Sequence, residues 1–107
     1  MPITDDDAER AADYIRDNAT KAAEAHATRI YLTEYRKSLK ALLMAERLLD
    51  ALGAQERHAY SHQKYLQHLD VLREAIAEDK KMEWLMKAAE TKIDVWRSQS
   101  ANSRGKI

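Results

Sequence analysis

The sequence of 107 residues contains no cysteine and no phenylalanine, a single proline and only two glycines. Without cysteine the chain can form neither a disulfide nor a thiolate metal site. It also has very few of the residues that interrupt helices or close tight turns. Its two glycines, Gly53 and Gly105, are far apart, so the sequence holds no glycine-rich phosphate loop.

A long apolar run and a net charge are absent as well. No apolar stretch approaches the roughly 20 residues of a membrane span, and the acidic N-terminus lacks the pattern of a signal peptide. The 18 Lys and Arg residues are balanced by 18 Asp and Glu residues, which argues against a generic basic nucleic-acid binder. We therefore expect a soluble cytoplasmic protein with no membrane partner.

Strong helix formers make up most of the chain and predict an all-α fold. Thr4 precedes three aspartates and is expected to cap a first helix over residues 5–52. Gly53 follows as a C-terminal cap, and Ser61 is a plausible N-cap for a second helix over residues 63–102. The segment between them, residues 53–62, could hold a short helical turn of its own. The result is a long antiparallel helical hairpin.

Apolar residues recur every three or four positions along the second helix and define one stripe. The spacing slips across Asp79, between Ile76 and Met82, which could divide an intrachain packing zone from an intersubunit one. As a helix, the stretch from Tyr65 to Asn102 would be roughly 57 Å long, more than a compact chain of this size can hide. We therefore expect coiled-coil-like hairpins that assemble into a homo-oligomer. The expected interface comprises Leu32, Tyr35, Leu39, Leu42, Leu69, Leu72, Ile76, Leu85, Ile93 and Trp96.

The chain reads as a single helical domain, residues 1–107, with two distinctive ends. Residues 1–28 form an acidic, alanine-rich N-terminal arm in which Tyr14 and Ile15 are the only large anchors. With so little to bury, this arm is expected to fray or to dock against a partner subunit. Residues 103–107 are expected to form a basic, flexible tail.

No group of residues in the sequence has the spacing of a catalytic site. His58 and His62 are four residues apart, as are paired histidines in helical zinc sites. However, Glu56 would point elsewhere on a helix and His68 lies beyond the break expected at Ser61, so a third ligand is missing. We expect a solvated turn, with no metal, no cofactor, no small-molecule substrate and no enzymatic activity.

Two groups of basic residues are the plausible nucleic-acid features, although such groups also commonly solvate a helix. In the expected hairpin, residue 40 lies opposite roughly residue 75, so the two groups would lie at different levels. Trp84 could stack on bases or serve as a hairpin or oligomer contact, and Tyr31 could also stack on bases. The candidate DNA-binding residues are Arg36, Lys37, Lys40, Trp84, Lys87, Lys92, Arg97 and Arg104.

Three stretches together carry a resemblance to a known group of proteins. They are YLTEYRKSLKALLMAERL (31–48), QERHAYSHQKY (55–65) and KIDVWRSQSANSR (92–104). The chain resembles small helical proteins of tailed bacteriophages, whose genes often lie among early replication and recombination genes. It is also similar to the UvsY-type recombination mediators of T-even phages, most clearly at Ile93, Trp96 and Arg97.

The resemblance implies a ring-like homo-oligomer in the bacterial host cell. Such an oligomer would bind single-stranded DNA and help to load a recombinase onto strands coated by single-strand-binding protein. The alternative is a structural or adaptor protein that uses the same apolar stripes to bind another phage or host protein, without nucleic acid.

Overall fold

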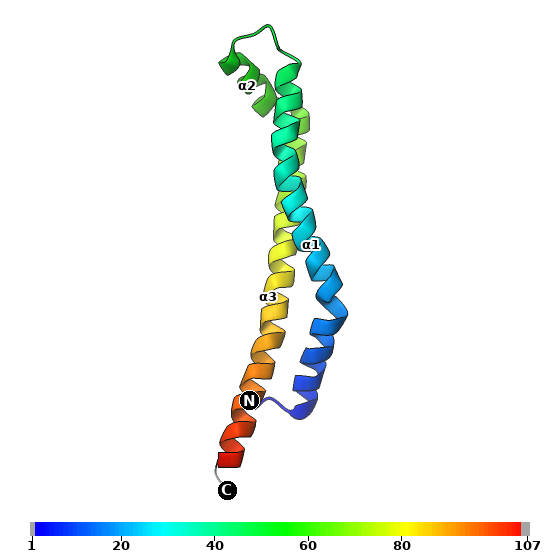
Figure 1. Ribbon diagram of the computed structural model, residues 1–107, viewed down its shortest axis with the longest axis vertical. Coiled ribbons are helices and arrows are strands. Elements are labelled where there is room, and N and C mark those ends of the chain that lie inside the picture. Colours follow the sequence, from blue (N-terminus) through cyan, green and yellow to red (C-terminus); the bar gives the residue numbers. More distant parts are fainter. Residues whose placement is uncertain (1, 106–107) are drawn as a thin grey trace. The chain divides into compact units, whose positions relative to one another are not determined.

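The computed structural model describes residues 2–105, which form three helices (Figure 1): α1 (Asp5–Ala45), α2 (Leu52–Ser61) and α3 (Gln63–Gly105). No strand occurs among these residues, so the predicted all-α class is confirmed. Within the same range, no helix combines the length and the hydrophobicity needed to cross a membrane.

Two reciprocal hydrogen bonds close the first turn of α1. The Asp7 N–H donates to Thr4 Oγ1, and the Thr4 N–H donates to Asp7 Oδ2, both at 3.0 Å. Together they form a capping box and confirm Thr4 as the N-cap. The charge-assisted bond from the Thr4 backbone N–H also lowers the pKa of the Asp7 carboxyl below its ordinary value.

The end of α1 differs from the prediction. The helix ends at Ala45 rather than at residue 52, and the chain continues in tight turns that begin with a bond from the Glu46 N–H to the Leu43 carbonyl. Leu48 and Leu49 are 73% and 102% exposed. Residues 46–52 have helix propensity but no surface to pack against. Propensity alone is too weak to extend α1 through them.

Both predicted caps of the connection were wrong. Gly53 lies inside α2 without a positive φ, so it is not a left-handed C-terminal cap. Ser61 is the last residue of α2, where its hydroxyl donates to the Arg57 carbonyl. His62 precedes α3 instead, and its Nδ1 accepts the Lys64 N–H at 3.0 Å.

The second long helix starts where predicted and ends later. It runs from Gln63 to Gly105, so residues 103–105 of the expected flexible tail are helical. Lys106 and Ile107, the rest of that tail, lie outside the described residues.

The contacts divide the chain into two compact units. The first, called the arm unit here, joins the described residues up to Glu24 to those from Lys80 onward. Ala8 and Ala11 of α1 are buried in this unit, as are Met82 and Ala89 of α3. Small alanine side chains allow the two helix backbones to approach closely, so the arm has a packed face despite its few large residues.

Two hydrogen bonds join the start of the chain to the far part of α3 within the arm unit. The Trp96 indole N–H donates to Asp5 Oδ1 at 2.7 Å, and the Ile3 N–H donates to Gln99 Oε1 at 3.0 Å. The acidic arm therefore packs against its own chain, whereas the sequence suggested fraying or a partner subunit.

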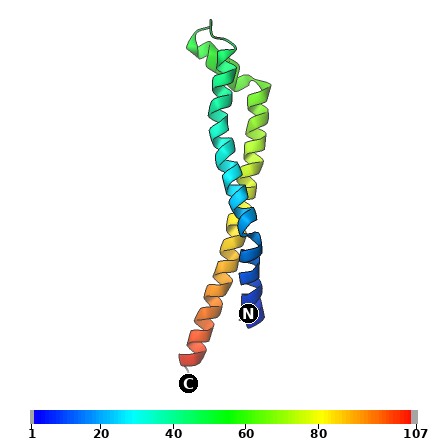
Figure 2. The same cartoon turned by 45° about the vertical axis from the view of Figure 1, so that its right-hand side comes forward.

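The second unit, residues 25–79, is called the hairpin unit. It contains the end of α1, all of α2 and the start of α3. Figures 1 and 2 show α2 folded back along the end of α1. The core of this unit consists of Leu39, Leu43, Ala59 and Tyr65, with Met44 packed against it.

Polar side chains form part of the buried face of the hairpin unit. His68 is 8% exposed, and its Nε2 lies 2.8 Å from the Leu32 carbonyl oxygen. Asp79 is 5% exposed, and its Oδ2 lies 3.0 Å from Arg29 Nη1 and 3.2 Å from His26 Nδ1. Both buried polar groups therefore have a partner, as burial requires.

These polar residues remove the predicted slip in the pattern of α3. When the half-buried Ala75 is counted with the buried residues, the three- and four-residue intervals continue from Tyr65 through Asp79 to Met82. Leu69, Ile76 and Leu85, which the sequence placed on the main stripe, are 36–41% exposed. The prediction followed apolar side chains only, whereas the buried face of the helix includes a histidine and an aspartate.

Candidate nucleic-acid interface

Three of the predicted DNA-binding residues lie together in the hairpin unit. Arg36, Lys37 and Lys40 line a hollow of about 370 Å³, and two tyrosines complete its wall. These are Tyr60 of α2 and Tyr65 of α3. Cationic side chains beside aromatic rings are the combination that tracks phosphates and stacks bases in single-stranded nucleic acid. We call this group the basic-aromatic hollow.

Contacts among these side chains fix the hollow. The Lys40 Nζ lies 4.7 Å from the centroid of the Tyr60 ring, and the Tyr60 and Tyr65 rings meet edge to face with centroids 5.4 Å apart. Bonding to the Tyr60 side chain raises the pKa of Lys40 above its ordinary value. The hollow thus presents a fully charged ammonium group beside Tyr60, which is 45% exposed.

A second pair of rings lies on the preceding turns of α1. Tyr31 and Tyr35 stack with centroids 6.2 Å apart and an interplanar angle of 17°. Tyr31 is 65% exposed, so one ring of the pair is open to solvent. Tyr35 also lies 5.4 Å from the ring of His68, which anchors the pair on α3.

Sequence reasoning placed residue 40 opposite roughly residue 75 and so missed Tyr60 and Tyr65 as its neighbours. The short helix α2 occupies the connection and brings Tyr60 back alongside α1. The sequence allows a short helical turn at residues 53–62, but it does not predict which helix that turn packs against.

The remaining predicted DNA-binding residues belong to the arm unit and are more dispersed. Lys87 Nζ lies 5.2 Å from the centroid of the Trp84 ring, which is 65% exposed. Glu90 and Asp94 line the same shallow hollow and oppose a phosphate. The other three do not line it. Lys92 lines a different groove with Asp7, Arg97 pairs with Asp94 at 3.7 Å, and the Nε of Arg104 donates to the Ser100 carbonyl.

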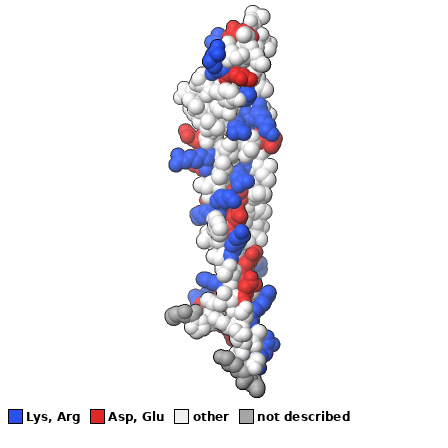
Figure 3. All heavy atoms as spheres, turned by 90° about the vertical axis from the view of Figure 1, so that its left-hand side faces the viewer, with Lys and Arg blue, Asp and Glu red and all other residues white. Residues whose placement is uncertain are grey.

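Acidic side chains interrupt the basic ones on the one face of the molecule that Figure 3 draws. On the face drawn in Figure 3, Lys and Arg side chains form small groups with Asp and Glu side chains between them. This pattern favours a short contact with a nucleic acid over a long continuous basic track.

The predicted oligomer-interface residues fall into two classes. Leu39 and Leu72 are buried within the hairpin unit, and Leu32, Ile93 and Trp96 are half-buried within their own units. The other five remain accessible, with exposures between 36% and 62%. They are Tyr35, Leu42, Leu69, Ile76 and Leu85.

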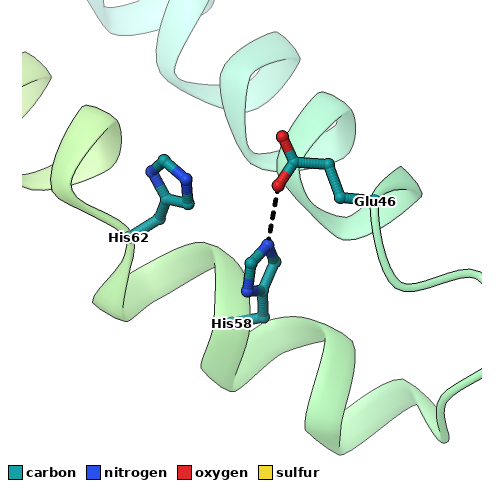
Figure 4. A group of neighbouring side chains, drawn as sticks. All are labelled: Glu46, His58 and His62. Carbon is teal, nitrogen blue, oxygen red and sulfur yellow. Dashed lines mark hydrogen bonds and ion pairs between the residues drawn. The ribbon is translucent and has the colours of Figure 1, made fainter.

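The turn after α1 supplies a residue that the search for a metal site missed. Glu46 Oε2 lies 2.8 Å from His58 Nε2, and the His62 ring points toward the same pair (Figure 4). The hydrogen bond with His58 lowers the pKa of the Glu46 carboxyl. Glu46 is twelve positions from His58, outside any local ligand spacing, so only the fold reveals this trio.

Comparison of the chain with protein-family models, with curated proteins and with solved structures gives no match. The resemblance to phage recombination mediators therefore stays a prediction, and the residues themselves must support any functional argument.

Proposed function

We propose that this protein is a non-enzymatic accessory factor of phage DNA recombination or replication, which binds single-stranded DNA through the hairpin unit. The basic-aromatic hollow is the observation that supports the proposal. It groups three cations with two tyrosines at one place, and the stacked pair of Tyr31 and Tyr35 lies on the preceding turns of α1.

Each part of the hollow has a distinct role in this proposal. Arg36, Lys37 and Lys40 neutralise successive phosphates, and their counterions are released on binding. Tyr60 and Tyr31 offer exposed ring faces for bases, an interaction without sequence preference. Three phosphate contacts give a slope of about −2 for log affinity against log salt concentration.

One such site is small, so the proposed function also depends on assembly. In a homo-oligomer, several hollows bind one strand, and each further contact is intramolecular, which raises the affinity far above that of one site. The accessible apolar residues Leu42, Leu69 and Ile76 are suited to such contacts between chains. A strand held along the assembly would be presented to a recombinase.

Fluorescence anisotropy with a labelled single-stranded oligonucleotide tests this proposal. We expect binding at low salt that weakens markedly at moderate salt. Replacing Arg36, Lys37 and Lys40 with Gln should reduce the affinity at least tenfold. Lys21→Gln, an exposed change elsewhere on α1, serves as the matched control and should have little effect. If the unaltered chain does not bind at low salt, the proposal is wrong.

The alternative is an adaptor protein that binds another protein and no nucleic acid. The exposed apolar side chains of the hairpin unit favour it, because Leu42, Leu66 and Val71 are each about half exposed or more. In that case a defined protein partner should be captured equally well with and without nuclease treatment. Substitution of Leu42 and Val71 with Lys should abolish the capture, whereas the Gln variants of the basic residues should retain it.

A further inference from the structure

We propose that Glu46, His58 and His62 form a binding site for one divalent transition-metal ion, with Zn²⁺ as the best fit. One donor atom from each of the three side chains lies within 4.8 Å of the other two. Across residues 2–105, this is the only group of three potential metal-binding side chains that come so close together. The inference does not depend on DNA binding.

The three donors come from three separate parts of the backbone. Glu46 lies in the turn after α1, His58 lies in α2, and His62 is the extended residue between α2 and α3. The two imidazole rings approach edge to face, with centroids 5.5 Å apart. A shared ion would therefore tie the turn after α1 to α2 and to the start of α3.

The donor set determines the class of ion. Two imidazole nitrogens and one carboxylate oxygen suit Zn²⁺, with water in the remaining positions, and also suit Co²⁺ and Ni²⁺. Ca²⁺ and Mg²⁺ prefer a shell of oxygen ligands, so two histidines disfavour both. The single carboxylate leaves the site with a net positive charge when the ion is bound.

Small side-chain movements convert the present arrangement into a coordination shell. Ligand atoms around tetrahedral zinc are about 3.3 Å apart, given metal–ligand bonds of about 2.0–2.1 Å. The bonded pair of Glu46 and His58, now at 2.8 Å, opens slightly, and the His62 ring moves inward. Glu46 is exposed and the two histidines are only half-buried, so their side chains can rotate.

The proton that His58 Nε2 donates to Glu46 must move to His58 Nδ1 when Nε2 binds the ion. His62 must also change its tautomer. Its Nδ1 accepts the Lys64 N–H, so the neutral ring carries its proton on Nε2. When Nε2 binds the ion, that proton moves to Nδ1, and the Lys64 N–H turns to solvent. The loss is one hydrogen bond at an exposed position, which the new metal bond replaces.

The ion would act as a structural clamp at a weakly packed end of the hairpin unit. The adjoining residues Leu48, Leu49 and Leu52 are 64–102% exposed, so apolar burial does little to hold this connection. Binding of a metal to the folded arrangement alone stabilises that arrangement by mass action.

Titration of the unaltered 107-residue chain, without an affinity tag, tests the site. Isothermal calorimetry with Zn²⁺ at neutral pH should give one ion per chain, and the melting temperature should rise with Zn²⁺ and fall again with EDTA. Imidazole NMR signals of His58 and His62 should shift on titration, whereas those of His26 and His68 should not. No saturable binding, half an ion per chain, or equal shifts of all four histidines would each overturn the proposal.

Variants identify the ligands independently. His58→Gln, His62→Gln and Glu46→Gln should each reduce the Zn²⁺ affinity at least tenfold, since even outer partners of metal ligands contribute about 10- to 100-fold. Glu56→Gln on α2 is the matched control and should keep the affinity, and circular dichroism verifies that each variant is folded. An equal loss in the control would contradict the assignment, and the NMR titration of the unaltered chain decides the question if a variant unfolds.

Discussion

Asp79 is a carboxylate on the buried face of α3, where a coiled-coil pattern would ordinarily place an apolar residue. Its Oδ2 lies within reach of Arg29 and His26 from α1, so the charge is paired inside the hairpin unit. A single buried polar position of this kind is known to fix the register of paired helices at some cost in stability. Here the pairing with Arg29 favours one alignment of α1 against α3.

Removal of this carboxylate should be strongly destabilising. Asp79→Ala leaves Arg29 without a partner on a packed face and should lower the free energy of unfolding by about 2 kcal/mol. The effect is smaller than for a fully buried pair because the Arg29 side chain is 32% exposed. Urea denaturation measures it. Asp70→Ala, an exposed acid on the same helix, should change stability by less than about 0.5 kcal/mol, and equal effects at both positions would refute the buried pair.

Thr4 and Asp7 give a second prediction, which depends on pH. The pKa of Asp7 is lower in the folded chain than in the unfolded chain, so its stabilising contribution is complete above the ordinary carboxyl pKa. That contribution is lost as the pH falls through the lowered value. Asp7→Asn should therefore be less stable than the unaltered chain near neutral pH, and the difference should vanish in acid.

Chemical denaturation of the two chains across a pH series measures this difference. Asp6→Asn is the control, because Asp6 contacts Arg10 and not the capping threonine. A constant difference between Asp7→Asn and the unaltered chain at every pH would contradict the role of the Asp7 charge.

The role of a residue could be predicted from the sequence only where its partners lie close by along the chain. Thr4 was found because a cap is decided by neighbours within one turn. Asp79 was excluded from the core because its charge suggested solvent, and only the packed structure reveals Arg29 as its partner. Tyr60 and Glu46 were missed for the same reason, since each meets its partners through the return of α2.

At the scale of elements, the connection differs most from the expected hairpin, because the short helical turn expected at residues 53–62 is a ten-residue helix, α2, that packs against α1. The long helices were predictable from composition and spacing, and the start of each was close to its observed position. The end of α1 was not, because residues 46–52 are good helix formers without a surface to pack on. The segment from Leu52 to Ser61 instead forms a separate helix, held by burial of Ala59 in the core.

A substitution at Gly53 distinguishes the C-terminal cap that the sequence predicts from the helical position that the structure gives this residue. A cap glycine with a positive φ is destabilised by any side chain, but Gly53 is helical, and a Cβ built on it would meet only Arg57 Nη1 at 3.7 Å. Gly53→Ala should therefore raise the free energy of unfolding by about 0.4–1 kcal/mol. Thermal or urea unfolding tests this. Gly105→Ala near the end of α3 is the control with little expected effect, and destabilisation by Gly53→Ala would favour the cap.

At the scale of the whole molecule, the proposed homo-oligomer makes a direct prediction about mass. Light scattering of the unaltered chain should give a multiple of 12.3 kDa. Leu69→Lys combined with Ile76→Lys places charges on accessible apolar positions of α3 and should reduce the mass to that of one chain without loss of helicity. Val95→Lys, at an exposed apolar position in the arm unit, is the control. A monomeric unaltered chain at micromolar concentration would contradict the assembly.

The short helix α2 has one more consequence, which follows from the placement of His58 and Tyr60 only two residues apart. If a zinc ion restrains His58, it also restrains the ring beside Lys40, so the proposed metal site and the proposed DNA site share one short helix. If both ligands favour the same position of that helix, thermodynamic linkage requires zinc to strengthen oligonucleotide binding by the same factor by which the oligonucleotide strengthens zinc binding. The affinity of the chain for a single strand would then depend on the concentration of free zinc around it.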